Sequence, residues 1–138
     1  NSARPSASRS RSMTNVLLDS NLIIYASRPQ HEALRTFIAR ETPSVSVVSK
    51  IETLGYHKLG EQEKEFLDEF FDAAEVLPVF EAVVTESIQL RQQRRMSLGD
   101  AMIAETALSR NLTLATRNTS DFEWIQSLDI VDPVAEEQ

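Results

Sequence analysis

Short runs of aliphatic and β-branched residues alternate along this chain with longer amphipathic stretches, and this alternation restricts the folds that it can adopt. The runs that we expect to be strands are 15–18, 45–48, 76–80, 112–115 and 130–131. Between them, apolar residues recur at the spacing of one helix face, as Phe66, Phe70 and Phe71 do in the stretch 61–74. Strands that alternate with helices predict an α/β fold with a mainly parallel sheet.

The same spacing predicts the other elements. Further helices are expected from Leu22 onward and over 34–40, 49–56, 81–95 and 99–110. Pro78 has no amide hydrogen to donate to a neighbouring strand, so the run 76–80 is expected at an edge of the sheet.

The chain has 138 residues, which is the length of one domain. Residues 1–12 contain no large apolar residue, and we interpret them as a remnant of cloning or a disordered leader. Residues 13–134 are then the domain, and 135–138 a frayed tail. No apolar run approaches the roughly 20 residues that cross a bilayer, and there is no cysteine. We therefore expect a cytoplasmic protein without a membrane partner.

The charge balance is acidic, with 21 Asp and Glu against 14 Lys and Arg and a net charge of −7. Such a balance counts against general nucleic-acid binding, because the phosphate backbone favours lysine and arginine. Acidic residues can instead be concentrated where cations bind, or they can attract a basic protein partner.

Four acidic residues occur where predicted strands end or the following helices begin. Asp19 directly follows the first run, Glu52 lies in the helix after the second, and Asp100 opens a later helix. Asp121 follows the turn after 112–115. Because ligands of open α/β sheets bind beyond the carboxyl ends of the strands, we expect all four at one edge.

Each of these residues also has an ordinary structural interpretation. Asp19 can form a turn, Asp100 can interact with a helix dipole, and Asp121 can cap a short helix over 122–128. Ser49 and Glu52 have the spacing of a capping box. Together, however, clustered carboxylates repel one another unless a cation is present, and oxygen ligands suit Mg²⁺ or Mn²⁺. The four residues therefore make a metal site plausible.

Three segments resemble the signature blocks of the PIN-domain family, and especially its VapC-type toxins. They are Val16–Tyr25, Gly99–Ala104 and Leu114–Asn118 continued by Asp121–Phe122. They occur in the family's order, with Glu52 between the first two, and the resemblance covers nearly all of 13–134.

The resemblance implies a three-layer α/β/α fold, Mg²⁺- or Mn²⁺-dependent endoribonuclease activity, a homodimer and a cognate antitoxin protein. By position, Asp19, Glu52, Asp100 and Asp121 match the family's acidic metal centre, while Ser20, Asn21, Thr116 and Asn118 match its supporting polar residues. Whether Asn118 or Asp121 contacts metal directly stays open. Glu105 departs from many relatives, and helical geometry turns it away from Asp100, so we expect a solvated or dimer-surface acid.

The arginines Arg91, Arg94, Arg95 and Arg117 are candidates for guiding an RNA backbone, although a solvated helix end explains them equally well. The two histidines, His31 and His57, have no motif partner, and no Gly-x-Ser-x-Gly segment occurs. Two other functions stay open: a PIN-like binding module that does not cut, and a metal-dependent nuclease that acts on DNA.

Overall fold

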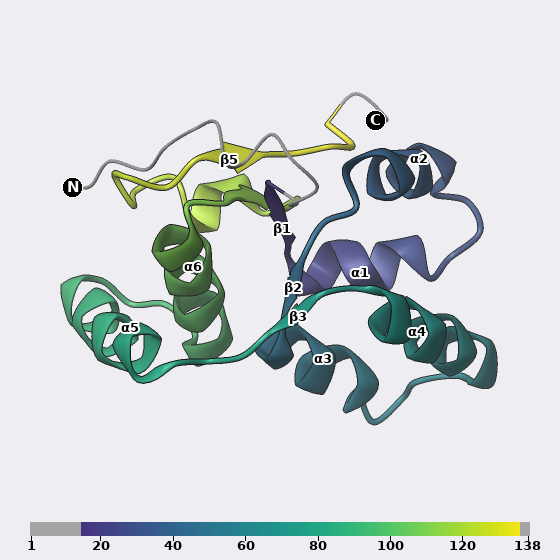
Figure 1. The fold of residues 1–138 in the computed structure, drawn as a ribbon, viewed down its shortest axis with the longest axis horizontal. Coiled ribbons are helices and arrows are strands. Elements are labelled where there is room, and N and C mark those ends of the chain that lie inside the picture. Colours follow the sequence, from purple (N-terminus) through teal and green to yellow (C-terminus); the bar gives the residue numbers. More distant parts are fainter. Residues whose placement is uncertain (1–14, 136–138) are drawn as a thin grey trace.

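The computed structural model describes residues 15–135, and its strands are all parallel to their neighbours (Figure 1). The strands are β1 (Val16–Leu18), β2 (Val45–Ser46), β3 (Val76–Leu77), β4 (Thr113–Ala115) and β5 (Ile130–Val131). They form two ladders, β1-β4-β5 and β2-β3. Two backbone hydrogen bonds join the ladders, from Leu18 N to Ser44 O at 3.0 Å and from Ser44 N to Val16 O at 2.8 Å. The strands therefore run in the order β3-β2-β1-β4-β5.

Helices connect the strands, as the alternation predicted. They are α1 (Ser20–Ala26), α2 (Glu32–Glu41), α3 (Val47–Leu54), α4 (Glu61–Ala73), α5 (Glu81–Gln93) and α6 (Leu98–Arg110), with a short 3₁₀ helix over Thr119–Asp121. The predicted α/β fold with a parallel sheet is confirmed, and β3 lies at a sheet edge, paired with β2 alone among the described residues.

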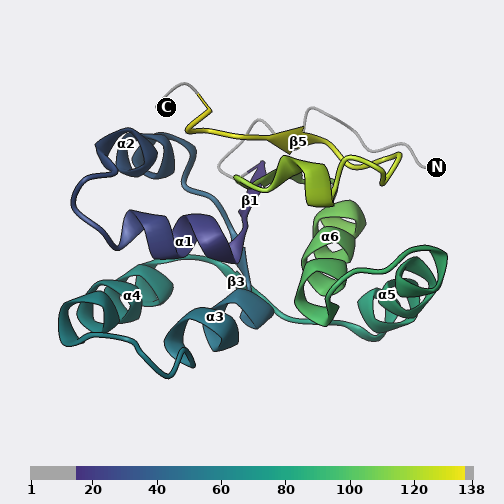
Figure 2. The same cartoon turned by 180° about the vertical axis from the view of Figure 1, so that it is seen from behind.

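Two apolar clusters lie on opposite faces of the sheet, because successive side chains of a strand point to opposite sides. In β1, Leu18 belongs to the cluster covered by α1, α2 and α4, and Leu17 to the cluster covered by α5 and α6. Figures 1 and 2 show the strands between these two groups of helices. The molecule thus has the three α/β/α layers that the resemblance implied.

Two boundaries differ from the prediction. Helix α3 begins at Val47, because the hydroxyl of Ser46 caps it by accepting from Val48 N at 2.9 Å. No helix covers 122–128; that segment forms turns in which Phe122, Ile125 and Leu128 are nevertheless buried. Burial in a cluster therefore explains their helix-like spacing.

The order of the strands determines where a ligand site can form. From β1 the chain proceeds to β2 on one side, while β4 lies on the other side of β1. Such a switch leaves a crevice at the carboxyl ends of the two central strands. Leu18 and Ala115 are paired at that point, so Asp19 and Thr116 follow them side by side.

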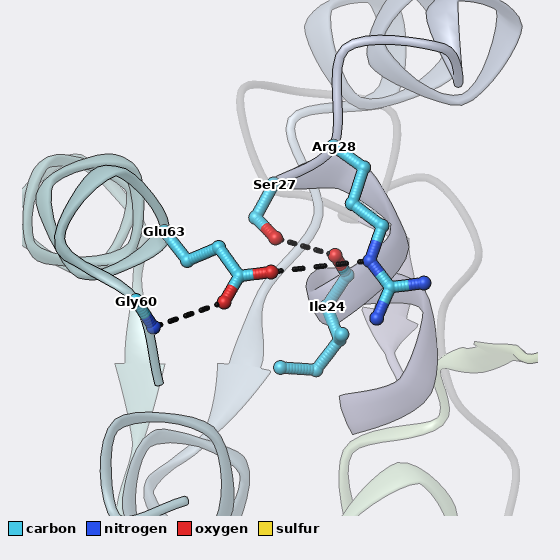
Figure 3. Close-up of polar contacts among 5 residues, drawn as sticks. All are labelled: Ile24, Ser27, Arg28, Gly60 and Glu63. Carbon is cyan, nitrogen blue, oxygen red and sulfur yellow. Dashed lines mark hydrogen bonds and ion pairs between the residues drawn. The ribbon is translucent and has the colours of Figure 1, made fainter. Parts of the chain in front are cut away.

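Polar contacts lie at the C-terminal end of α1, which is the end away from Asp19 (Figure 3). Arg28 Nε lies 3.9 Å from Glu63 Oε2, and the other oxygen of Glu63 accepts from Gly60 N at 3.2 Å. The Ser27 hydroxyl donates to the carbonyl of Ile24 at 2.6 Å. The ion pair connects the end of α1 with the start of α4, and the two hydrogen bonds are local to these ends. An ion pair this exposed stabilises the fold only slightly.

Among residues 15–135, every helix is too short or too polar to cross a membrane. Val134 is buried and Ala135 lies in an exposed turn at the end of this range. The expectations for residues 1–12, and for the rest of the tail, fall outside the described residues.

Candidate active site

Asp19 is held at the end of β1 by hydrogen bonds on both carboxylate oxygens. It caps α1, where Oδ1 accepts from Ser20 N at 2.7 Å. Oδ2 accepts from the hydroxyl of Thr116 at 2.7 Å, and that hydroxyl in turn accepts from Asn118 N at 3.0 Å. Thr116 is fully buried and Asp19 is only 4% exposed. The predicted supporting residues Ser20, Thr116 and Asn118 therefore fix the position of this carboxylate directly or through one another.

Burial raises the pKa of Asp19 to about 6, even though the bonds from Thr116 and Ser20 favour the charged form. The negative charges of Asp100 and Glu52 contribute smaller increases to this value. At neutral pH this group is mostly ionised, and its buried charge lowers the stability of the fold, a cost that a cation beside it would offset.

Glu52 reaches the same region from α3. Its Oε1 accepts from the Ser20 hydroxyl at 2.7 Å, and Ser20 Oγ also lies 2.8 Å from Ser49 Oγ. The capping-box alternative is wrong, because α3 begins at Val47 and Ser49 is not its cap. The side chain of Glu52 thus interacts with α1 rather than with its own helix start.

Asp100 lies in the first turn of α6, where its amide donates to the hydroxyl of Ser97 at 3.0 Å. Burial raises the pKa of the Asp100 carboxyl group and a side-chain hydrogen bond with Ser97 partly opposes this, while the charges of Asp121 and Glu52 add to the increase. Asp121 is exposed in the 3₁₀ helix. We call Asp19, Glu52, Asp100 and Asp121 the acidic edge. The four acids come from separate segments, and the charges of the others contribute to the raised pKa of Asp19 or of Asp100.

Gly99 allows α3 and α6 to approach each other at this point. A Cβ on Gly99 would overlap Oε2 of Glu52. Any other residue here would displace Glu52 or move α6, so the glycine of the predicted signature block has a steric role.

The chemistry of the acidic edge suits a hard divalent ion. Within residues 15–135, no three acidic or imidazole side chains stand close enough together to form a ready ligand set. The available donors are nevertheless oxygens, which Mg²⁺ and Mn²⁺ prefer. Near the start of α1, Oδ1 of Asn21 is buried and accepts no hydrogen bond from any residue in the described range. An oxygen in that state has capacity left for a cation or a water.

Three of the four candidate arginines gather beside the acidic edge. A cavity of about 710 Å³ is lined by Arg91, Arg94, Arg95, Met96, Ser97, Asp100, Asp121 and Trp124. We call it the arginine cavity. Arg117 does not line it, and its guanidinium carbon instead lies 5.0 Å from the ring centroid of Tyr25.

Several residues of this region carried no site prediction from the sequence. No sequence signal distinguishes Ser97 and Ser49, because serine is common near helix starts. Trp124 could have been noticed, because it is the chain's one tryptophan and follows Asp121 closely. The expectation of a solvated Glu105 is wrong. This residue is only 9% exposed, and its pKa is raised by burial and by Glu86, because α5 packs over that side of α6.

The geometry agrees with comparisons to solved structures. FitAcB from Neisseria gonorrhoeae is 27% identical, with a TM-score of 0.69 over 87% of this chain and 99% of that chain. DNA-bound VapBC from Salmonella typhimurium is 24% identical, with a TM-score of 0.75 over 88% of this chain and 99% of that chain. A toxin–antitoxin complex from Klebsiella pneumoniae is 24% identical, with a TM-score of 0.68 over 86% and 97%.

The two likenesses at 24% identity demonstrate a shared fold. Among curated proteins, no sequence matches this chain. The family model of the PIN domain matches residues 16–125, a range that includes the whole acidic edge. The chain therefore belongs to the PIN domain family.

Proposed function

We propose that this chain is a Mg²⁺- or Mn²⁺-dependent endoribonuclease, the toxin of a VapC-type toxin–antitoxin pair. One observation carries the proposal: at the carboxyl end of the parallel sheet, burial and the charges of neighbouring acids from separate segments raise the pKa of Asp19 and of Asp100. A structural role for each acid does not require that the four be neighbours.

In the proposed reaction a water oxygen bonds to phosphorus, the bond to the leaving oxygen breaks, and that oxygen takes a proton. A divalent ion would supply the positive charge that activates water and neutralises the transition state. The acidic edge would hold the ion. Thr116 and Ser20 would keep Asp19 and Glu52 in place, while Asn21 and Asn118 would support the ligands or the water.

RNA is the proposed substrate because the resemblance implies it and because three arginines border the acids. Purified protein should cut labelled RNA with Mg²⁺ or Mn²⁺ and should stop with a chelator. Cleavage of DNA alone would favour the DNA nuclease, and cleavage of neither would favour the silent binding module.

Metal binding can be tested apart from activity. Millimolar Mn²⁺ should raise the melting temperature of the parent, because the ion relieves repulsion present only in the folded state. Asp100→Asn should lose most of that rise, whereas Asp72→Asn, an exposed acid on α4, should keep it. A melting temperature insensitive to Mn²⁺ in the parent would contradict a metal centre.

The proposed antitoxin partner has two supports. The similar structures from Klebsiella pneumoniae and Salmonella typhimurium are described as a toxin–antitoxin complex and as VapBC. The net charge of −7 also suits a basic peptide laid across the acids. The expected partner is a small protein encoded beside this one that suppresses cleavage. If the protein encoded by the neighbouring reading frame does not suppress cleavage, the antitoxin proposal is wrong.

A homodimer is proposed from exposed apolar side chains on neighbouring elements. Ile51 on α3, Val84 and Ile88 on α5 and Leu98 on α6 are 67%, 45%, 55% and 59% exposed. A groove of about 480 Å³ between α5 and α6 includes Val84, Ile88 and Leu98 in its lining. Burial in a two-fold contact would remove this surface from water. Light scattering should give roughly twice the chain mass of 15.5 kDa, and Ile88→Lys should lower it.

A further inference from the structure

The arginine cavity combines features that a surface of ordinary solvated arginines lacks. Arg91, Arg94 and Arg95 line one cavity, yet none forms an ion pair with an acid among residues 15–135. In a chain with 21 acidic residues, three gathered cations without acidic partners suit an anion from outside the chain. Asp100 and Asp121 line the same cavity, so that anion would lie directly beside the acidic edge.

Trp124 gives the cavity an aromatic wall whose orientation is fixed. Its Nε1 donates to the backbone carbonyl of Asp121 at 3.1 Å, so the indole is held relative to an acidic-edge residue. The side chain is half-buried and packs partly against the α5–α6 cluster. Packing alone would account for a tryptophan here, but it would not require the ring to border a cavity lined by arginines.

Arg94 covers the ring in this structure, with its guanidinium carbon 5.2 Å from the centroid. A planar cation in this position marks where another planar group can stack. Stacking of a nucleobase on an aromatic ring is stronger than an exposed cation–π contact, so a base can replace Arg94. Arg91 is restrained differently, because its Nε donates to the carbonyl of Met96 at 3.1 Å.

We propose that the arginine cavity is a subsite for one unpaired RNA nucleotide next to the scissile phosphate. The base stacks on Trp124, and Arg91 and Arg95 bind its phosphate. The volume of about 710 Å³ is in the range of small-ligand pockets. An acidic peptide fits less well, because a carboxylate side chain has no planar ring to stack on Trp124. Double-stranded RNA fits less well too, because its stacked bases cannot reach an indole face.

This inference rests on the proposed nuclease function and names the part of the substrate that the site selects. Its test uses the fluorescence of Trp124, the only tryptophan in the chain. The probe is a short single-stranded oligoadenylate, titrated in chelator so that no cleavage occurs. Stacking should quench the fluorescence, and a duplex of the same length should quench it much less.

Variants separate stacking from packing. Trp124→Leu keeps an apolar side chain but has no ring, and its affinity for the oligoadenylate, measured by anisotropy of a labelled strand, should fall about tenfold. Trp124→Phe loses the Nε1 bond but keeps an aromatic face, and should recover most of that affinity. Arg95→Ala should also weaken binding. Arg110→Ala is the matched control, because Arg110 makes a similar contact with Phe80 at 5.8 Å outside the cavity.

The outcomes distinguish the subsite from the nuclease. Quenching and a tenfold loss in Trp124→Leu support the subsite even if no metal condition gives cleavage. Cleavage of RNA by the parent, with no quenching and with the parental KM retained in Trp124→Leu, overturns the subsite and leaves the nuclease proposal standing. If Trp124→Leu melts far below the parent, Trp124→Phe decides: parental affinity supports the proposal, and a loss equal to that of Arg95→Ala overturns it.

Discussion

Two groups of charged side chains meet at Asp100, and the structure restrains them differently. On one side, Asp19 is buried and accepts hydrogen bonds on both oxygens from Ser20 and Thr116. On the other side, the arginines of the cavity are exposed, and among residues 15–135 the contact found for Arg94 is with the ring of Trp124. The acidic edge is thus partly rigid before any ligand arrives, while the arginine cavity can rearrange.

The difference matches two separate tasks. Groups that take part in bond breaking need a fixed position, because small displacements reduce the rate strongly. Groups that accept an RNA strand gain from side chains that adapt to it. We therefore expect changes at the acidic edge to alter turnover, and changes at the cavity to alter substrate binding.

The largest effect is expected for Glu52→Gln. The amide keeps the shape of the side chain and can still accept from the Ser20 hydroxyl, but it has no charge to offset a cation. Cleavage should fall about 1,000-fold, or roughly 4 kcal/mol of barrier. Single-turnover cleavage of labelled RNA measures this.

The outcome for Glu52→Gln also tests whether the acidic edge and the arginine cavity have separate tasks. Because Glu52 does not cap α3, the metal-free melting temperature should stay close to the parental value. A variant that binds RNA with parental affinity but does not cut it would show that Glu52 acts in bond breaking and not in substrate binding. Cleavage at the parental rate would confine the metal centre to the three aspartates.

The pH dependence of stability should give the next largest effect. The pKa of Asp19 rises from its ordinary value of 3.8 to about 6 in the fold, so the folded chain binds this proton more tightly than the unfolded chain. The stabilisation is complete below the unfolded pKa and is lost as the pH rises through about 6. The change is on the order of 3 kcal/mol.

Asp19→Asn isolates this effect from other titrating groups, because the amide does not ionise. Measured by urea unfolding in chelator, the stability of Asp19→Asn relative to the parent should rise by about 2 kcal/mol from about pH 4 to about pH 7. A difference independent of pH would mean that Asp19 ionises as easily in the folded chain as in the unfolded one.

Much of the fold and part of the acidic edge were predictable from the sequence. The parallel sheet followed from the alternation of strands and helices, and Asp19 and Asp100 from their places at a strand end and a helix start. These signals are local, since each depends on a few consecutive residues.

Other features depend on contacts between distant segments. The approach of Gly99 to Glu52 joins α3 to α6, and the arginine cavity joins the end of α5 to a turn after β4. Glu105 was expected at the surface because helical spacing shows which face a residue occupies, but not which helix packs over it. No pattern within one segment contains that information.

A third prediction uses the approach of Gly99 to Glu52. In Gly99→Ala, the new methyl group would overlap Oε2 of Glu52 and displace it from the Ser20 hydroxyl. Alanine also favours a helix over glycine by up to about 1 kcal/mol, so stability should be unchanged or higher while cleavage falls about 10- to 30-fold.

Gly60→Ala is the control for this variant. A Cβ on Gly60 would lie 3.7 Å from Glu63 Oε1, which is ordinary contact, and the residue is remote from the acidic edge. Its cleavage rate should equal that of the parent. Parental cleavage by Gly99→Ala as well would show that Glu52 has room to move without loss of function.

The smallest effect is expected for Arg117→Ala. The sequence groups Arg117 with the cavity arginines, but the structure packs it over Tyr25, whose ring also stacks on His31 at 4.6 Å. Loss of this contact should lower the unfolding free energy by about 0.5–1 kcal/mol, measured by urea unfolding.

RNA binding then decides to which group Arg117 belongs. Each arginine that contacts a phosphate adds roughly 0.7 to the slope of log affinity against log salt for a single strand. Arg95→Ala should reduce the slope by about that amount, and Arg117→Ala should leave it unchanged. If both variants reduce the slope equally, Arg117 leaves the Tyr25 ring to meet the RNA backbone. The adaptable side of the site would then extend across the acidic edge to the start of the Thr119–Asp121 turn.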